Sequence, residues 1–204
     1  MNVLGLTGNM GSGKTSVGEI LRDLGCPVID ADKEAHRTYK AGSQTWQQIV
    51  DAFGDTILTP DGEIDRQVVG RKVFEEPEAL ARLNAIVHPA TRARVERRLR
   101  EFEQDGHFWA TVEATLLIES GWQDMVKRLW VVAAPIDLVV ARLSISRKLS
   151  EDEVRSRIAS QMAVEEKMAL ADDIIYNDGN MDDLRRRVEQ LWHTLSPPDR
   201  RDGD

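Results

Sequence analysis

Cysteine, aromatic residues and long hydrophobic runs are all scarce in this sequence. Its 204 residues include one cysteine, Cys26, so no disulfide can form within the chain and no cysteine cluster can bind a metal. No stretch approaches the ~20 consecutive apolar residues that a membrane-spanning helix needs. Hydrophobic residues make up 41% and charged residues 30%, which is typical of a globular domain. We therefore expect a globular protein that does not cross a membrane.

A surplus of basic residues is missing too. Lys and Arg number 27 against 35 Asp and Glu, giving a formal net charge of −8. Nonspecific nucleic-acid binding depends on a basic surface, so we do not expect nucleic acid as a partner. An acidic exterior can still contain a local cationic pocket for an anionic ligand. The first residues form too short an apolar run for a signal peptide and lack a basic region, so we expect a cytoplasmic location.

The beginning of the chain has the pattern of a strand, a turn and a helix. Residues 3–6 are apolar and predict a buried strand. After a glycine-rich turn, apolar residues recur at helical spacing: Val17, Ile20, Leu21 and Leu24. Gly25 and Pro27 mark the end of that helix, and residues 27–29 predict a second strand. This order predicts parallel strands joined by a right-handed crossover.

The remaining segments predict one α/β core with inserted helices. Residues 33–104 have a mainly helical pattern, with a turn at residues 60–62 and helix boundaries at Pro77 and Pro89. Further strands are predicted at residues 107–112, 129–134 and 173–176. Further helices are predicted at residues 136–157 (with a polar break at 144–150), 161–170 and 181–195, and a frayed tail at 196–204.

The glycine-rich turn carries the most specific motif of the sequence. Residues 8–15 match G-x-x-x-x-G-K-[ST] in full, between a predicted strand and a predicted helix. Glycines let the backbone curl so that several N–H groups converge on a polyphosphate, and the helix start adds its positive dipole end. We therefore expect the phosphates of a nucleotide to bind at Gly8, Asn9, Met10, Gly11, Ser12, Gly13, Lys14, Thr15 and Ser16.

Within the motif, individual side chains have predictable tasks. Lys14 places a positive charge between the β- and γ-phosphates, and the Thr15 hydroxyl is a ligand for Mg²⁺. Ser16 is expected to donate to the α-phosphate. The motif predicts nucleotide binding but not the reaction, because GTPases, ATPases and kinases share it.

Two aspartates, Asp30 and Asp32, follow the second predicted strand. Ligands of an open parallel sheet gather at the carboxyl ends of its strands, so both carboxylates should face the γ-phosphate region, on the same side of the strand. A kinase needs a carboxylate that accepts the proton of the acceptor hydroxyl, and Asp32 is the better candidate. Asp30 could bind Mg²⁺ through water or support the loop. The alternative is that the pair caps the following helix.

In combination, these residues and four later segments resemble the dephospho-CoA kinase family. Residues 83–89 match its L-N-x-x-x-H-P segment, and residues 113–119 are similar to its D-x-P-L-L-x-E segment. The pattern from Arg155 to Gln161 resembles its lid helix, and residues 171–179 its C-terminal A-D-x-x-I-x-N-x-G segment. The resemblance runs in order from residue 3 to about residue 192.

The resemblance implies a three-layer α/β/α P-loop kinase fold with a parallel five-stranded sheet. It implies a single domain with a core at about residues 1–34, 106–140 and 165–195, a helical acceptor-binding insertion at 35–105 and a lid at 141–164. ATP and Mg²⁺ are the implied cofactors and dephospho-CoA the implied small-molecule substrate. Asp32 is the implied base and Arg142 the start of the lid. Asn177 and Gly179 would lie near the adenine, and His88, Pro89, Arg92 and Leu116 near the acceptor.

The sequence departs from the family pattern at several positions. Thr115 stands where proline is usual, and Glu113 where aspartate is common. Ser146 takes the place of a frequent lid arginine, with Arg147 one residue later. An arginine there stabilises the charge that develops during transfer, so this departure bears on the rate. Glu113 remains a candidate for a position near the metal.

Two features allow more than one interpretation. The arginines that follow Pro89 could bind the pyrophosphate of the acceptor, or could form i,i+4 ion pairs with Glu96 and Glu101 on a solvated helix face. His88 could shape the acceptor site or make a structural hydrogen bond.

We predict an ATP-dependent dephospho-CoA kinase. The alternative enzyme is another small-molecule P-loop kinase, with a nucleoside, nucleotide or shikimate-like acceptor. A GTP-dependent switch is disfavoured because its guanine-reading N-K-x-D element has no full match, the nearest segment being residues 180–183.

Overall fold

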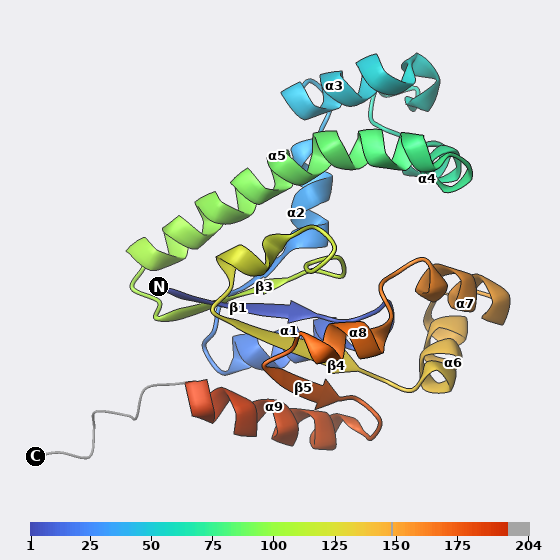
Figure 1. The fold of residues 1–204 in the computed structure, drawn as a ribbon. Helices are drawn as coiled ribbons and strands as arrows, with labels where there is room; N and C mark the ends of the chain where they lie inside the picture. Colours follow the sequence, from blue (N-terminus) through green and yellow to red (C-terminus); the bar gives the residue numbers. More distant parts are fainter. Residues whose placement is uncertain (148, 196–204) are drawn as a thin grey trace, which may run out of the picture. The chain divides into compact units, whose positions relative to one another are not determined.

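The computed structural model describes residues 1–147 and 149–195 and divides into two compact units. We name the first, Met1–Val28 with Asp105 onward, the phosphate-loop unit. The second, Ile29–Gln104, is the helical unit. Figure 1 shows strands concentrated in the first and helices alone in most of the second.

Five strands form one sheet. They are β1 (Asn2–Thr7), β2 (Val28–Asp30), β3 (Trp109–Glu113), β4 (Arg128–Ala133) and β5 (Asp173–Tyr176). Their order is β2-β3-β1-β4-β5. β1 pairs in parallel with β3 and β4, and β4 pairs in parallel with β5. The α/β class with a parallel five-stranded sheet is therefore confirmed, and the carboxyl ends of its central strands lie at one edge.

Helices of the phosphate-loop unit follow the strands. α1 (Lys14–Asp23) packs against α9 (Met181–Leu195), and α8 (Val164–Ala169) packs against β4. α6 (Ile136–Arg147) and α7 (Glu151–Ala159) pack against each other, and a short 3₁₀ helix, η2, spans Trp122–Met125. α1 ends where Gly25 adopts a positive φ of 83°, as expected of a residue just beyond a helix.

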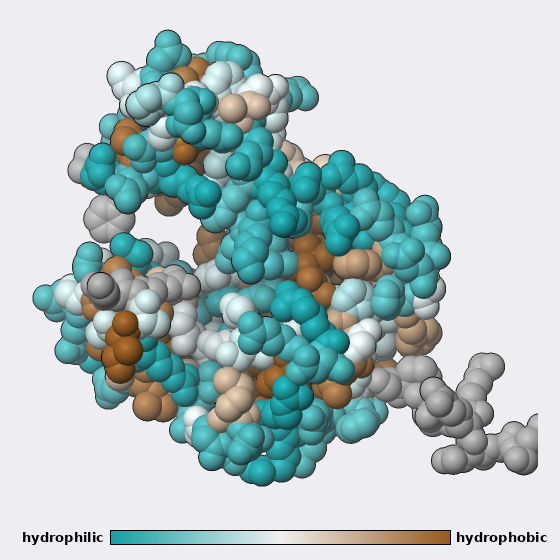
Figure 2. Space-filling model, turned by 180° about the vertical axis from the view of Figure 1, so that it is seen from behind, coloured by the Kyte–Doolittle hydropathy of each residue, from teal (hydrophilic) through white to brown (hydrophobic). Residues whose placement is uncertain are grey.

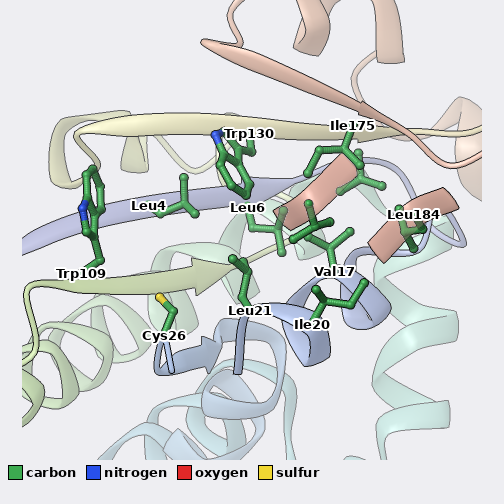
Figure 3. Packing of buried hydrophobic residues seen from close by; sticks show 12 residues of the cluster. Leu4, Leu6, Val17, Ile20, Leu21, Cys26, Trp109, Trp130, Ile175 and Leu184 are labelled. Atoms are coloured by element: carbon green, nitrogen blue, oxygen red, sulfur yellow. The ribbon is translucent and has the colours of Figure 1, made fainter. Parts of the chain in front are cut away.

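The core of this unit is aliphatic with buried indoles. Leu4, Leu6 and Trp130 are fully buried in the sheet, and Val17 and Leu21 of α1 pack onto them. Figure 3 shows these side chains directed toward one another between the sheet and the helices. The Trp130 Nε1 donates to Asp173 Oδ2 at 2.9 Å, so the polar atom of the buried ring is satisfied.

The helical unit is organised around one long helix. α5 (Pro77–Gln104) packs against α2 (Ala31–Thr38), α3 (Gln44–Phe53) and α4 (Arg66–Glu75), and a 3₁₀ helix, η1, spans Asp55–Ile57. Ser43 and Asp65 accept backbone N–H bonds and cap α3 and α4. A second hydrophobic cluster stabilises this unit: Ile49, Phe53, Ile57, Ile64, Val69 and Ala79.

The boundary predicted at Pro89 is wrong, whereas the one at Pro77 is confirmed. α5 begins at Pro77 and continues through Pro89 to Gln104. A proline inside a helix removes one backbone hydrogen bond. The Thr91 hydroxyl bonds to the Val87 carbonyl at 2.8 Å close to this point, and packing against three helices keeps α5 continuous. His88 therefore lies within a helix rather than at a turn.

The helices in the segment expected to form the lid have bounds that differ from the predicted ones. α6 continues through Arg147 and α7 begins at Glu151, so the polar break predicted from residue 144 does not interrupt α6 there. The helix expected at residues 161–170 is shorter, because the Met162 amide donates to the Glu119 carboxylate and α8 starts only at Val164. The tail at 196–204 lies outside the described residues.

On the face that Figure 2 shows, hydrophilic residues predominate and hydrophobic ones form small separate areas. Among the described helices, none is both long and apolar enough to cross a membrane.

Candidate active site

The loop between β1 and α1, residues 8–13, has the backbone that a phosphate cradle requires. Gly8, Gly11 and Gly13 have φ values of 146°, 77° and 102°. A Cβ at Gly8 would overlap the Val132 carbonyl oxygen, and one at Gly11 would come within 2.6 Å of Val139. Each of these positions therefore requires glycine for two reasons, conformation and space. We call this segment the phosphate loop.

Side chains from distant parts of the chain fix the second half of the loop. Asn177, which follows β5 and is buried, donates its Nδ2 to the Ser12 carbonyl at 2.8 Å. Arg142 of α6 donates to the Asn177 carbonyl at 3.3 Å. A Cβ at Gly13 would overlap the Asn177 amide nitrogen. The structure thus brings together Arg142, Asn177 and the loop, with Asn177 acting as a brace for the backbone.

Lys14 is the first residue of α1 and is buried, with 8% of its surface exposed. Its Nζ donates to the carbonyl oxygens of Gly8 at 2.8 Å and Asn9 at 3.2 Å. The ammonium group therefore folds back over the first half of the loop. It lies beside the curled backbone of the loop, where a point charge would be most effective toward a phosphate chain.

Thr15 and Glu113 form a pair of oxygen ligands beside the loop. The Thr15 hydroxyl donates to Glu113 Oε1 at 3.2 Å, and Glu113 is buried at the end of β3. Mg²⁺ prefers hard oxygen ligands and commonly takes only one or two from the protein, the rest coming from phosphates and water. Within the described residues there is no cluster of three or more His, Cys, Asp or Glu. The residues present therefore fit a nucleotide-bound Mg²⁺ rather than an independent metal site.

A cavity of about 460 Å³ lies beside the phosphate loop. Asn9, Met10 and Ser12 of the loop line it, together with residues of α6, α7 and α8. Asn9 Oδ1 and Ser12 Oγ are buried and have no hydrogen-bond partner among the described residues. Buried polar atoms are normally satisfied, so these two are suited to bonding with water or a ligand that enters the cavity.

Asp30, the last residue of β2, and Asp32 do not have the common orientation that was expected. Asp30 is the N-cap of α2 and accepts from the Lys33 amide at 2.9 Å. Asp32 lies in the first turn of α2. The expectation that both project from one side of a strand is therefore wrong, because the helix begins one residue after Asp30. The capping interpretation is confirmed for Asp30, and the role of Asp32 as base stays a prediction.

His88 and Pro89 lie in the middle of α5. Burial lowers the pKa of the half-buried His88 imidazole below its ordinary value, so the ring is neutral at pH 7. Burial likewise lowers the pKa of His36 on α2, helped by Arg66 and opposed by Asp32 and Asp30. Neutral rings can donate and accept hydrogen bonds but carry no charge for an anionic substrate.

Several arginines of α5 have carboxylate partners. Arg92 pairs with Glu96 at 2.9 Å and Arg98 with Glu101 at 2.8 Å. Arg94 forms an ion pair with the buried Glu34 of α2. The i,i+4 pair that the solvated-face interpretation predicts is present at Arg92. Whether Arg92 also meets the acceptor stays a prediction.

Two other predicted site residues, Leu116 and Gly179, lie in loops, whereas Ser146 lies on α6. Leu116, in the segment after β3, is 38% exposed. Gly179 follows β5, and a Cβ there would approach the Asp183 carboxylate. The Ser146 hydroxyl donates to the Arg142 carbonyl at 2.7 Å, so it is used within α6. The prediction about the reach of the Arg147 side chain lies outside the described residues.

Thr115 contributes through its backbone. Its carbonyl accepts from the Thr7 hydroxyl at 3.3 Å and from Lys167 Nζ at 2.8 Å. Proline, the usual family residue, carries the same carbonyl, so this departure leaves both interactions possible.

Sequence reasoning overlooked three long-range interactions, two in the phosphate-loop unit and one in the helical unit. Gln161 accepts from the Met10 amide, Lys167 is completely buried against Glu119, and Glu34 pairs with Arg94. No local pattern signals them, because the partners are far apart in the sequence. A lysine two-thirds of the way along a short polar helix gives no sign that it is buried.

Comparisons with known proteins agree with this geometry. The family model described as dephospho-CoA kinase matches residues 2–183. A dephospho-CoA kinase of Geobacter sulfurreducens is 43% identical over 197 residues, covering 97% of this chain and 100% of the relative.

Two solved structures share the fold over most of their length. A dephospho-CoA kinase from Campylobacter jejuni superposes with a TM-score of 0.71 at 29% identity, covering 96% of this chain and 97% of the other. The protein TT1252 from Thermus thermophilus superposes with a TM-score of 0.84 at 33% identity, covering 96% and 98%. Together with the matching family model, these relatives show that the chain belongs to the dephospho-CoA kinase family.

Proposed function

We propose that this chain transfers the γ-phosphoryl group of ATP to the ribose 3′-hydroxyl of dephospho-CoA, the last step of coenzyme A biosynthesis. The observation that carries the proposal is the complete phosphate loop, with its glycine conformations and its buried Lys14, in a chain of this family. A cytoplasmic location stays a prediction from the sequence.

The nucleotide would be bound mainly by backbone. Amide groups of residues 11–16 and the start of α1 are the donors for the phosphates, and Lys14 supplies charge between the β- and γ-phosphates. Asn177 holds the Ser12 carbonyl and so fixes the curl of the loop before the nucleotide arrives. Preorganised donors of this kind stabilise the charge that develops during phosphoryl transfer.

Mg²⁺ would be held by the Thr15 hydroxyl, with Glu113 beside it. The two side chains already meet at 3.2 Å, so a metal entering here would share oxygens that the fold has brought together. When bound, the ion neutralises charge on the phosphates. The burial of Glu113 at a strand end keeps its carboxylate in place for that contact.

The acceptor would be activated by the helical unit. Asp32 is the candidate that accepts the proton of the ribose hydroxyl as the bond to phosphorus forms. His88, Pro89 and Arg92 of α5, and Leu116 after β3, are the candidates that contact dephospho-CoA. Arg142 and the helices α6 and α7 would form the lid that excludes water, so that ATP is not hydrolysed instead.

Another small-molecule kinase and a GTP-dependent switch are the rival functions. Both would use the same loop, but neither accounts for the family match over residues 2–183. A panel of acceptors separates them: purified protein with Mg-ATP should consume ATP with dephospho-CoA and not with shikimate or nucleosides. Phosphorus NMR of the product should show a new 3′-monophosphate ester, and a chelator should stop the reaction. Equal activity on another acceptor, or a requirement for GTP, would contradict the proposal.

A further inference from the structure

A lysine outside the proposed catalytic machinery is completely buried. Lys167 on α8 has no exposed surface, and its Nζ contacts Glu119 Oε1 at 2.8 Å and the Thr115 carbonyl at 2.8 Å. A buried ammonium is costly unless it is paired and hydrogen-bonded, so both contacts are needed to keep it there. Both partners belong to the segment after β3, and Lys167 therefore ties α8 to that segment.

The same carboxylate reaches the segment between α7 and α8. We name residues 160–163 the α7–α8 junction. The Met162 amide donates to Glu119 Oε1 at 3.3 Å, the oxygen that also accepts from Lys167. Lys167 thus orients the carboxylate that in turn holds the junction.

From the junction, two hydrogen bonds go to the first half of the phosphate loop. Gln161 Oε1 accepts from the Met10 amide at 3.0 Å. Asn9 Nδ2 donates to the Met162 carbonyl at 3.2 Å. These contacts join segments more than 150 residues apart in the sequence, so they fix tertiary structure rather than a local turn.

The first half of the loop also orients Lys14. Its Nζ bonds to the carbonyls of Gly8 and Asn9, the second of which belongs to the peptide unit whose N–H is on Met10. Because a peptide unit is planar, the Met10 N–H that Gln161 accepts and the Asn9 carbonyl that Lys14 contacts move as one rigid group. A shift of this peptide therefore displaces the Lys14 ammonium.

We propose that Gln161 is a positioning residue for phosphoryl transfer: braced by Lys167 through Glu119, it holds the Asn9–Met10 peptide and thereby the Lys14 ammonium. The inference rests on the proposed function. Gln161 accepts from the Met10 amide, and the neighbouring Met162 carbonyl accepts from Asn9, whereas the amides of residues 11–16 are the proposed donors for the phosphates. Loss of Gln161 should thus affect the turnover of bound ATP more than its binding.

The test is Gln161→Leu, which keeps the size of the side chain and removes the acceptor oxygen. We expect kcat for dephospho-CoA phosphorylation to fall about 10-fold and KM for ATP to change less than about 2-fold, the pattern of an interaction realised in the transition state. The Tm should fall by only about 2–4 °C, which is typical of losing one partly exposed hydrogen bond in a chain of this size. The matched control is Gln190→Leu on α9, an exposed glutamine of the same unit, which should leave kcat and KM unchanged.

A second variant approaches the junction from its buried side. Lys167→Met should lower kcat by a similar factor in the fraction that folds, together with a clear loss of Tm, because Glu119 loses its cation. If Lys167→Met does not fold, the kcat of Gln161→Leu relative to that of Gln190→Leu tests the positioning role on its own.

The outcomes separate the two proposals. A Gln161→Leu protein whose kcat equals that of the control, or whose KM for ATP rises while kcat holds, overturns the positioning role. Wild-type protein that fails to phosphorylate dephospho-CoA contradicts the proposed function itself.

Discussion

The phosphate loop and the arginines of α5 both carry positive groups, but these groups are held in different ways. Donors in the loop are backbone amides and one lysine, fixed by side chains from distant segments such as Asn177 and Gln161. Charges on α5 are side chains, and most have a carboxylate partner close by on the same helix, as Arg92 has Glu96.

The two regions therefore differ in how much binding energy an anionic ligand must spend on rearranging them. Hydrogen bonds within the chain hold the loop in its curled conformation, so less binding energy need be spent on ordering it. An arginine in an ion pair must exchange its carboxylate for the ligand, and the gain is only the difference between the two interactions. We therefore expect substitutions in the loop to have large effects and substitutions on α5 to have small ones.

Lys14→Ala should produce the largest change. It removes the single charge that the loop places by the phosphates, and we expect kcat/KM to fall by roughly 10³, near the upper range for losing one preorganised electrostatic donor. Steady-state kinetics with ATP and dephospho-CoA measure it. Activity within 10-fold of wild type would mean that the loop is not the site of transfer.

Gly13→Ala should destabilise the fold. Its φ of 102° disfavours any Cβ by roughly 1–2 kcal/mol, and overlap with the Asn177 amide should add a further ~1–3 kcal/mol. The matched control is Gly25→Ala: its φ is 83° but a Cβ there would have open space. Urea unfolding of both variants separates the cost of conformation from that of overlap, and equal losses would show that the contact with Asn177 has no energetic role.

Much of the phosphate-loop unit could be predicted from the sequence because its signals are local. The bounds of β5 and α9 match the predicted segments, since turn residues and apolar periodicity define both. Pro89 was predicted wrongly because tertiary packing of α5 overrides a local breaker. The strand prediction is wrong for Asp32 because an N-cap and a strand end look alike in sequence, and Asp30 is both.

The contacts that position the site could not be predicted in the same way. Gln161 and Met10 are 151 residues apart, and nothing near either one indicates the other. Sequence motifs pointed to Lys14, Thr15 and Asn177, whereas the burial of Lys167 is visible only in the tertiary structure.

Arg92→Gln tests whether an arginine of α5 binds the acceptor. If Arg92 binds the acceptor, KM for dephospho-CoA should rise about 5–10-fold in this variant. The rise is limited because wild-type Arg92 must give up its ion pair with Glu96 in order to bind the ligand. Arg97→Gln is the control, since Arg97 also pairs with a glutamate of α5 but is 56% exposed, and it should leave KM unchanged. Equal KM values for both variants would assign Arg92 to the solvated face.

The smallest effect is expected at His88. Because burial holds its pKa below the usual 6.5, the unfolded chain binds a proton more readily than the folded one as the pH falls below about 6.5. Stability from His88 is thus full above that pH and decreases toward acid. Thermal melts between pH 5 and 8 should show a shallower acid decline for His88→Gln than for wild type, and parallel curves would contradict burial of the imidazole.

The claim that the helical unit provides the catalytic base is tested most directly by Asp32→Asn. Calorimetry with ATP and initial rates with dephospho-CoA should be measured on the same preparation. We predict an ATP Kd within about 2-fold of wild type and a kcat lower by about 10² or more, the range for losing a general base. A variant that turns over at the wild-type rate would show that the helical unit does not provide the base.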